Sequence, residues 1–303
     1  VHENMSSWEK IKKLMSPSTD SPTDDPDFPN EKLKTVLAFL FLQVSFVLIV
    51  TSIALTHDRV PDRDSVPPLP DIVLDNITPL PELMRLPDVL VIITLFLAGV
   101  LILFHQHRWI VARRMFIILG VLYLMRSVSI YVTVLPISNR TVYCAPKTNI
   151  TTFPVLAHRV WELLAGGGLQ ISGMKKSCGD YIYSGHTAML VIGMLVYKEY
   201  SPQRLWPIQW LTWAMAWGGM GILLLAHGHY TIDVIIGYYV ATRMFWTYHS
   251  LASDPSLKTK SSRNYHSEVW WFRIFQFFEA NVGGPLPNKY SFPVPFRSLP
   301  KLP

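Results

Sequence analysis

The sequence predicts an all-α integral membrane protein with six transmembrane helices. Half of its 303 residues are hydrophobic and only 16% are charged, whereas about a quarter of the residues of a soluble domain are charged. The apolar residues are also clustered into runs that are long enough to cross a bilayer as helices. The net charge of +6 does not indicate nucleic-acid binding, because the basic residues are scattered between the apolar runs, where they orient the spans.

Six apolar runs lie between two polar tails. The first tail, residues 1–32, is rich in Ser, Pro and Asp, and it is expected to be flexible with one short helix around residues 8–14. Residues 33–249 are expected to form one membrane domain. Its predicted spans cover approximately residues 33–55, 88–104, 115–135, 183–197, 205–226 and 230–248.

The segments between and after the spans complete this plan. Residues 56–87, which are rich in Pro and Asp, and residues 136–181 are expected to be loops outside the membrane. In the fifth span, Gly218, Gly219 and Gly221 predict the close approach of another helix. The second tail, residues 250–303, contains an aromatic amphipathic stretch at 270–278 that is expected to lie on the membrane surface.

Basic residues predict the orientation of the spans. Lys and Arg residues precede the first span and follow the second, fourth and sixth spans. Because positively charged loops stay in the cytosol, these four regions are assigned to it. Their basic residues are Lys10, Lys12, Lys13, Lys32, Lys34, Arg108, Arg113, Arg114, Lys198, Arg204, Lys258, Lys260 and Arg263. The bias is imperfect, because the loop after the third span also carries Lys147 and Arg159. Both chain ends would then face the cytosol, and the other loops would be lumenal or extracellular.

Glycosylation sequons and cysteines agree with this orientation. The sequons at Asn76, Asn139 and Asn149 all fall in loops expected on the lumenal side, although a further one at Asn4 lies in the first tail. The chain's two cysteines, Cys144 and Cys178, share the loop before the fourth span. An oxidising lumen would let them form a disulfide, and two free thiols are the alternative.

Two histidine motifs are predicted to carry the chemistry. If Thr231 lies near the start of a helix, His229 and Asp233 are one turn apart on the same face. His186, in Ser184-Gly185-His186-Thr187, opens the fourth span. The predicted topology places both motifs at the same depth and on the same side, where ionisable residues are costly and usually functional. We therefore expect them to meet in space, the alternative being separate interfacial histidines satisfied by backbone or water.

Two kinds of chemistry are compatible with these three side chains. Two histidines and a carboxylate are plausible metal ligands. In covalent catalysis, His229 would attack phosphorus, Asp233 would orient its ring, and His186 would protonate the departing oxygen. The glycine-flanked turn before His186 allows backbone amides to approach a phosphate. The residues alone leave both routes open.

The two motifs resemble the paired motifs of the sphingomyelin synthase family, which is related to the lipid phosphate phosphatases. The resemblance covers roughly residues 59–287. It also includes Pro67-Pro68-Leu69-Pro70-Asp71, Arg126, Thr133-Val134-Leu135-Pro136, Tyr143-Cys144-Ala145-Pro146-Lys147, Gly166-Gly167-Gly168-Leu169 and Thr242-Arg243-Met244-Phe245-Trp246. Several motifs in this order are more specific than any one of them.

The resemblance implies a lipid phosphate phosphatase-like core and an enzyme that transfers phosphocholine from phosphatidylcholine to ceramide, releasing diacylglycerol. His229 would form a phosphohistidine, Asp233 would orient it, and His186 would act as acid and then as base. No metal or other cofactor is implied. The expected partners are membrane lipids, not nucleic acid, and the sequence leaves a homo-oligomer open. The site would face the lumen of the Golgi or the outside of the plasma membrane.

Further residues are predicted to bind the substrate. Ser184, Gly185 and Tyr230 adjoin the catalytic residues in sequence. Arg126 and Arg243 are expected either to hold a lipid phosphate, to pair with a carboxylate, or to extend toward the membrane interface.

Gly228 departs from the family pattern. Relatives have an acidic residue between the two histidines of this motif, and that residue is associated with the choice of head group. Glycine removes the charge and is expected to loosen the backbone, so the donor preference stays open. Asp180 is the nearest carboxylate that would substitute, although capping of a loop or helix start is its other interpretation.

Three other functions remain open. A ceramide phosphoethanolamine synthase would use phosphatidylethanolamine as donor. A lipid phosphate phosphatase would use water in place of ceramide, but such enzymes generally carry basic residues ahead of the second histidine, and residues 224–228 are Leu-Leu-Ala-His-Gly. A transporter or an inactive lipid-binding relative would use the pocket without turnover.

Overall fold

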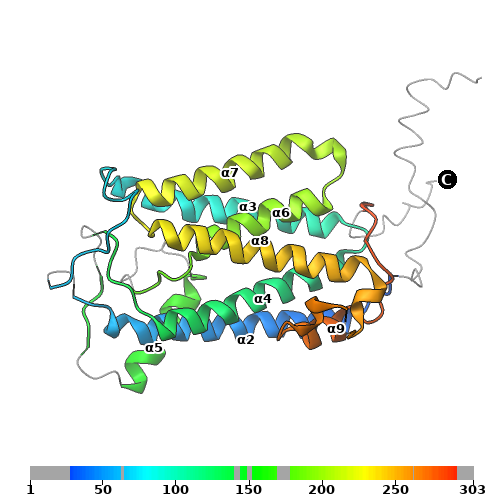
Figure 1. The fold of residues 1–303 in the computed structure, drawn as a ribbon, viewed down its shortest axis with the longest axis horizontal. Helices are drawn as coiled ribbons and strands as arrows, with labels where there is room; N and C mark the ends of the chain where they lie inside the picture. Colours follow the sequence, from blue (N-terminus) through cyan, green and yellow to red (C-terminus); the bar gives the residue numbers. More distant parts are fainter. Residues whose placement is uncertain are drawn as a thin grey trace, which may run out of the picture.

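The long helices of the protein lie side by side along its longest axis (Figure 1). The computed structural model describes residues 28–62, 65–139, 144–148, 152–168, 178–261 and 263–291. The long helices within these ranges are α2 (Lys32–Thr56), α3 (Leu86–Phe104), α4 (Arg108–Val132), α6 (Gly185–Tyr200), α7 (Trp206–Leu225) and α8 (Thr231–Ser253). Each of them corresponds to one apolar run of the sequence. The helix expected around residues 8–14 lies outside the described residues.

Short elements connect and extend these helices. They are the 3₁₀ turns η1 (His57–Arg59), η2 (Pro81–Arg85), η3 (Gln203–Leu205), η4 (Pro255–Lys258) and η5 (Tyr265–Glu268), and the helices α5 (Phe153–Ala165) and α9 (Phe272–Glu279). Among the described residues, one isolated antiparallel bridge, between His105 and Tyr290, is the only strand-like pairing. The α8 helix continues to Ser253 and therefore passes the boundary at residue 249 that the sequence predicts for the membrane domain.

Four helical stretches in the described part of the chain are long and apolar enough to cross a membrane. They are Lys32–Arg59, Pro81–Phe104, Arg108–Val132 and Gln203–Leu225. The other two long helices differ in length and polarity, because α6 has only 16 residues and α8 carries Asp233 and Arg243. Both nevertheless pack within the bundle, since α6 contacts α3, α7 and α8. The structure thus gives four candidate spans, and the count of six stays a prediction.

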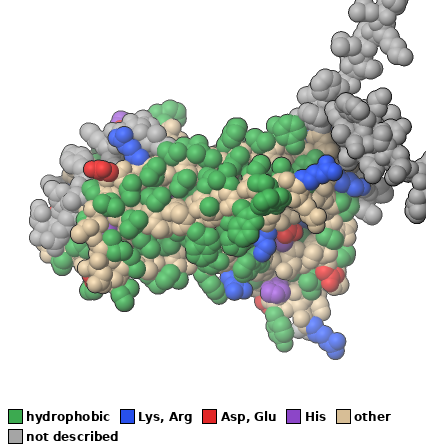
Figure 2. Space-filling view, turned by 90° about the horizontal axis from the view of Figure 1, so that it is seen from above, with side chains coloured by type: hydrophobic (Ala, Val, Ile, Leu, Met, Phe, Trp, Pro, Cys, Tyr) green, Lys and Arg blue, Asp and Glu red, His purple; other side chains and the backbone are tan. Residues whose placement is uncertain are grey.

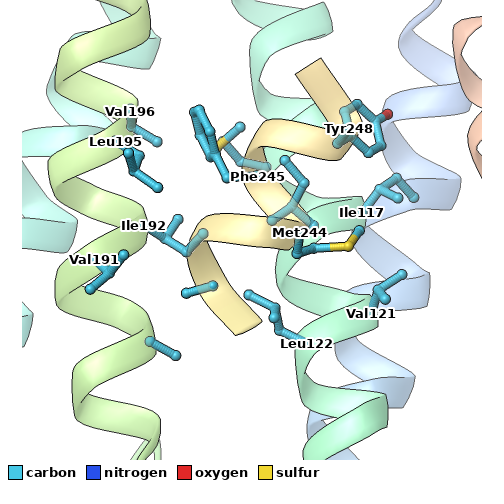
Figure 3. Close-up of a cluster of buried hydrophobic side chains, with 14 of the residues drawn as sticks. Ile117, Val121, Leu122, Val191, Ile192, Leu195, Val196, Met244, Phe245 and Tyr248 are labelled. Carbon is cyan, nitrogen blue, oxygen red and sulfur yellow. The ribbon is translucent and has the colours of Figure 1, made fainter. Parts of the chain in front are cut away.

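Side chains from α4, α6 and α8 form the centre of the bundle. Figure 3 shows them converging on one buried cluster, with Ile117, Val121 and Leu122 from α4, Val191, Ile192, Leu195 and Val196 from α6, and Met244, Phe245 and Tyr248 from α8. The α2 helix packs along α4, and α3 and α7 pack on α6. The core therefore fixes α6 and α8 against each other along most of their length.

The outer surface is apolar around the middle of the bundle. Figure 2 shows hydrophobic side chains over the middle of the visible face and charged side chains toward its two ends. In the middle of α2, Val44 is 59% exposed. A contiguous apolar belt of this kind is the surface that a protein presents to lipid.

Only one of the three glycines in α7 lies at a close helix contact. A Cβ atom on Gly219 would lie 2.5 Å from the Leu190 side chain of α6, whereas a Cβ on Gly218 or Gly221 would meet no atom within 4 Å. The prediction of close approach is therefore confirmed for Gly219 and wrong for the other two. The helix period explains this result, because residues one or two positions from Gly219 point to other sides of the helix.

The loop predicted at residues 136–181 contains a helix, so its prediction as a simple loop is wrong. The α5 helix lays Val160, Leu163 and Leu164 against a small apolar cluster on α2 and α4. Arg159 of α5 makes two hydrogen bonds to the Asp58 carboxylate, of 2.7 and 3.0 Å. Tertiary contacts thus stabilise a helix that is only 13 residues long and would be marginal alone. In the same region, Cys144 and Cys178 form a disulfide, which decides between the two alternatives for these cysteines.

The aromatic stretch of the second tail packs onto the protein itself. Trp271, Phe272, Phe275 and Phe278 are buried in the main core. The Arg114 guanidinium of α4 forms a two-bond ion pair with Glu279 at the end of α9, with distances of 3.0 and 2.8 Å. Part of the aromatic face therefore packs inward, with Trp271 and Phe275 against Tyr248 of α8, while Trp270 and Phe277 are exposed. Contact of this stretch with the membrane surface stays a prediction. Sequence reasoning missed the ion pair that brings α9 to this place.

The sequons at Asn76 and Asn139 differ in accessibility, which gives a prediction for glycosylation. Asn76 is exposed, but Asn139 is buried and its side-chain amide donates to the Ala226 carbonyl. With these loops on the lumenal side, Asn76→Gln should remove an endoglycosidase-sensitive sugar and change the gel mobility of the protein from cells. Asn139→Gln should leave the mobility unchanged. A sugar on Asn139 of the folded protein would contradict the buried position.

Candidate functional site

The first histidine motif lies at the start of α6. Ser184 is the N-cap residue, and its hydroxyl accepts a hydrogen bond of 3.3 Å from the Thr187 amide. Serine is favoured at this position because it satisfies one of the amides that a helix start leaves without a partner. The cap fixes where the helix begins. It thereby places His186 in the first turn of α6, at one end of the helix bundle.

Arg126 of α4 lies directly behind this helix start. Its Nε donates to the Tyr183 carbonyl at 2.7 Å, and its Nη2 donates to Asp180 at 2.5 Å. A Cβ atom on Gly185 would lie only 3.1 Å from the centre of the guanidinium, so glycine allows this close approach. Of the roles expected for Arg126, the structure places it in a pair with a carboxylate. Asp180 is then the partner of an arginine and not an isolated loop-start cap.

The second histidine motif lies at the start of α8, and the prediction of a helix beginning at Thr231 is confirmed. His229 Nδ1 lies 3.7 Å from Asp233 Oδ2. The same carboxylate oxygen accepts a hydrogen bond of 3.2 Å from the Tyr230 amide. Both side chains are buried, with 4% and 1% exposure. Asp233 therefore caps the helix and lies beside the imidazole at the same time.

The structure brings the two motifs together, as the sequence predicts. The Ser184 amide donates to the Asp233 carbonyl at 3.1 Å, which joins the starts of α6 and α8 directly. The ring centroids of His186 and His229 are 6.0 Å apart, with the ring planes at 61°. Both imidazoles are therefore within reach of one phosphoryl group placed between them.

Asp88 is a site residue that the sequence analysis missed. It lies in the first turn of α3 and is 3% exposed. Its Oδ1 lies 2.7 Å from His186 Nε2, which is hydrogen-bonding distance. Each histidine thus has its own aspartate. The available clue was that Asp88 opens the second predicted span, at the same membrane depth and on the same side as the two motifs.

Two polar atoms of the His229–Asp233 pair have no hydrogen-bond partner although they are buried. They are His229 Nδ1 and Asp233 Oδ1. At 3.7 Å, the His229–Asp233 pair is too long for a hydrogen bond. Catalytic hydrogen bonds are often long without substrate and tighten when it binds. The pair can therefore close by a small movement of the imidazole.

Tyr230 is buried between loops. Its hydroxyl donates to the Pro136 carbonyl and accepts from the Leu69 amide, both at 3.1 Å. The side chain expected to touch substrate therefore ties two loops to the start of α8. Tyr181 packs beside it and also lies 6.0 Å from the His229 ring, measured between centroids.

Gly228 lies in the turn that ends α7. Its amide donates to the Leu223 carbonyl at 2.9 Å, while the His227 amide donates to the Leu224 carbonyl at 3.0 Å. His227 has a φ of 51°, whereas Gly228 is not among the residues with positive φ. These bonds form the six-to-one and five-to-two pattern of a Schellman cap. The expectation that Gly228 loosens the backbone is therefore wrong, because its amide is held in this cap.

Arg243 does not lie with the other predicted residues. It is on α8, ten residues after Asp233, which corresponds to about 15 Å along the helix axis. Its guanidinium lies over the rings of Tyr239 and Trp246, 5.4 Å from each centroid, and its side chain is exposed. This contact matches the expected extension toward the surface.

The arrangement is suited to acid–base and nucleophilic chemistry at phosphorus. One imidazole is held by a short contact to a carboxylate, and the second keeps its Nε2 away from its own carboxylate. An aspartate beside an imidazole fixes the tautomer and stabilises the charge that develops on the ring. Within the described residues, no group of three His, Cys, Asp or Glu side chains has the arrangement of a metal site.

Comparison with known proteins identifies relatives that cover most of the chain. Residues 177–250, which include both histidine motifs, match the family model described as PAP2 superfamily C-terminal. The chain is 41% identical over 280 residues to phosphatidylcholine:ceramide cholinephosphotransferase 1 of Rattus norvegicus, covering 91% of this chain and 66% of that protein. It is 41% identical over 274 residues to phosphatidylcholine:ceramide cholinephosphotransferase 2 of Homo sapiens, covering 90% and 75%. The match therefore spans just under two thirds of the length of the rat protein.

The contact between α6 and α8 gives a prediction for Gly237. A Cβ atom there would lie 2.9 Å from the Ser184 carbonyl oxygen, so Gly237→Ala should force the two helices apart and cost about 1–3 kcal/mol. The measurement is the melting temperature of the purified protein in detergent. Gly218→Ala on α7 is the matched control, because open space surrounds that position, and it should be neutral or stabilise by about 0.5–1 kcal/mol. Equal melting temperatures for both variants would show that the contact is not tight.

Proposed function

Because the chain belongs to the phosphatidylcholine:ceramide cholinephosphotransferase family, the sphingomyelin synthases, we propose that it transfers phosphocholine from phosphatidylcholine to ceramide. The products would be sphingomyelin and diacylglycerol. The observation that carries this proposal is the pair of histidine rings at the starts of two helices, 6.0 Å apart between centroids, each with an aspartate beside it.

In the first step, His229 Nε2 attacks the phosphorus of the donor lipid. A nitrogen–phosphorus bond forms, the bond from phosphorus to the diacylglycerol oxygen breaks, and His186 gives its proton to that oxygen. Asp233 orients the His229 ring through its Nδ1. Asp88 orients the His186 ring through its Nε2 and stabilises the imidazolium before the proton leaves from Nδ1.

In the second step, ceramide takes the place of diacylglycerol. The ceramide hydroxyl gives its proton to His186, its oxygen attacks phosphorus, and the bond to His229 breaks. The head group is thereby transferred from one lipid to the other with no atom gained or lost. Both histidines return to their starting states. No step of this sequence uses a water molecule or a cofactor.

Positive charge behind the α6 start supports binding of the phosphate. The Arg126 guanidinium lies against Gly185, and the first amides of a helix favour an anion. We assign Arg126, Ser184 and Gly185 to this phosphate environment. Asp180 holds Arg126 in place, and Tyr230 and Gly228 shape the backbone on the opposite side.

We also propose that residues 33–249 form a catalytic domain in which α6 and α8 cross the membrane with the four candidate spans. Their packing among those spans supports the count of six. The Cys144–Cys178 disulfide joins loops at the end of the bundle that holds the site. Because disulfides persist in oxidising compartments, this end would face the Golgi lumen or the outside of the plasma membrane.

Phosphatidylethanolamine is the alternative donor, and Gly228 is the observation that keeps it open. A carboxylate at this position would be a partner for the ammonium group of the donor, and glycine offers none. Asp180, the expected substitute, is already paired with Arg126.

A transfer assay tests the proposed function. Purified protein in liposomes would receive fluorescent ceramide with phosphatidylcholine alone, with phosphatidylethanolamine alone, or with neither, each with and without a chelator. Sphingomyelin should form with phosphatidylcholine at a rate that the chelator does not change, and His229→Ala should abolish it because the nucleophile is lost. Product only from phosphatidylethanolamine would favour the alternative donor. Full transfer by His229→Ala would refute the nucleophile assignment.

Asp88→Asn tests the second histidine–aspartate pair. The substitution keeps the shape of the side chain but removes the charge that holds His186, so transfer should fall by about 10²–10⁴-fold, the usual contribution of a positioned acid–base group. Glu82→Gln, an exposed acid in η2, is the control and should retain the wild-type rate. If folded Asp88→Asn transfers at the wild-type rate, His186 does not depend on Asp88.

A further inference from the structure

The carboxylate of Asp71 binds the start of the helix that carries His229 and Asp233. Asp71 lies in the loop between α2 and α3. Its Oδ2 accepts a hydrogen bond of 2.7 Å from the Thr231 amide, and its Oδ1 accepts one of 2.7 Å from the Thr231 hydroxyl. The two residues are 160 positions apart in the sequence. This contact therefore connects a distant loop to the first residue of α8.

This contact satisfies an amide that α8 cannot satisfy itself. The first amides of a helix have no partner within the helix and are usually capped by the residue just before it. That residue here is Tyr230, whose hydroxyl is engaged with Pro136 and Leu69 instead. Asp233 caps the Tyr230 amide through Oδ2. Asp71 thus supplies the cap for Thr231 from outside the helix.

The Asp71 loop is itself held rigidly. The Val73 and Leu74 amides donate to Asp71 Oδ1 at 3.0 and 3.2 Å, and the Leu74 side chain is buried in a cluster with Tyr230 and Tyr181. Pro70 stands immediately before Asp71, and two more prolines precede it in the same motif. Proline fixes the backbone angle φ, so little conformational freedom is left to lose when the loop caps α8.

The carboxylate is ionised when it makes these bonds. Burial alone would raise the pKa of Asp71, but the hydrogen bonds from the Thr231 hydroxyl and amide and from the Leu74 and Val73 amides lower it below its usual value. A negative charge at this place also interacts favourably with the positive end of the α8 dipole.

We propose that Asp71 is a positioning residue for phosphoryl transfer, because its carboxylate fixes the first turn of α8 and with it the geometry of His229 and Asp233. This inference rests on the proposed function. Two aspartates accept hydrogen bonds from different amides at this helix start. Asp71 accepts from the Thr231 amide, while Asp233 Oδ2 accepts from the Tyr230 amide and lies 3.7 Å from His229 Nδ1. The Pro67–Asp71 motif thereby gains a role that does not require it to touch substrate.

The test compares Asp71→Asn with Asp62→Asn in the same purified protein in liposomes. Asp62 is an exposed carboxylate of the same loop, so its variant should match the wild type. Asp71→Asn should lower kcat by about 10–100-fold, the effect expected from a small misplacement of reacting groups, with KM for both lipids within about twofold, because the substrate contacts remain. Thr231→Val loses only the hydrogen bond from the hydroxyl to Asp71, so its kcat should lie between those of Asp71→Asn and Asp62→Asn.

Hydrogen exchange measured by mass spectrometry gives an independent reading of the same contact. Peptides covering residues 229–236 should exchange faster in Asp71→Asn, and those from α6 should not change. Faster exchange with an unchanged kcat would overturn the positioning role and leave a cap only. Unchanged exchange would overturn the contact itself. If the wild type transfers no head group, the proposed function fails, and the exchange result alone then decides whether Asp71 holds the helix start.

Discussion

The direct contact between the starts of α6 and α8 is the constraint on which the rest of the site depends. The hydrogen bond from the Ser184 amide to the Asp233 carbonyl exists only because Gly237 lets the backbone of α6 approach α8 without a side chain between them. Once this distance is fixed, His186 and His229 must lie side by side, since each is within four residues of the contact. The charged side chains around the site are then arranged about two helix starts whose separation is fixed.

Charged groups are placed around this contact in pairs that come from different segments. Arg126 of α4 meets Asp180, and His186 of α6 meets Asp88 of α3. A buried charge without a partner destabilises the fold. Removing one member of an ion pair therefore costs free energy, because the other charge stays buried without a partner. Pairing across segments therefore restricts how α3, α4 and α6 can be arranged. The site is thus fixed by electrostatics as well as by packing of the core below it.

Sequence reasoning succeeded where the information is local. The one-turn spacing of His229 and Asp233 predicts that their side chains lie close together, which the structure confirms although His229 precedes the helix. The length of each apolar run predicts a helix. It failed where the partner is far away in the chain. Asp88 and His186 are 98 positions apart, and nothing near Asp71 in the sequence indicates Thr231, 160 positions away, as its partner. From the sequence alone, the apolar face of α9 could equally have faced lipid, and its contacts are with residues far away in the chain, Tyr248 and Arg114.

The cap at the end of α7 changes how Gly228 should be understood. Glycine at this position need not serve for flexibility, since its amide is bonded to Leu223 and His227 takes the left-handed conformation instead. A Cβ atom on Gly228 would lie 3.2 Å from the sulfur of Met84, and a flexible methionine side chain can move by the small amount required. The backbone would therefore accept an acidic residue with little rearrangement. An acidic residue in place of Gly228 would consequently add a charge to an unchanged backbone, so any effect on the donor would arise from electrostatics at the head group and not from a different shape of the site.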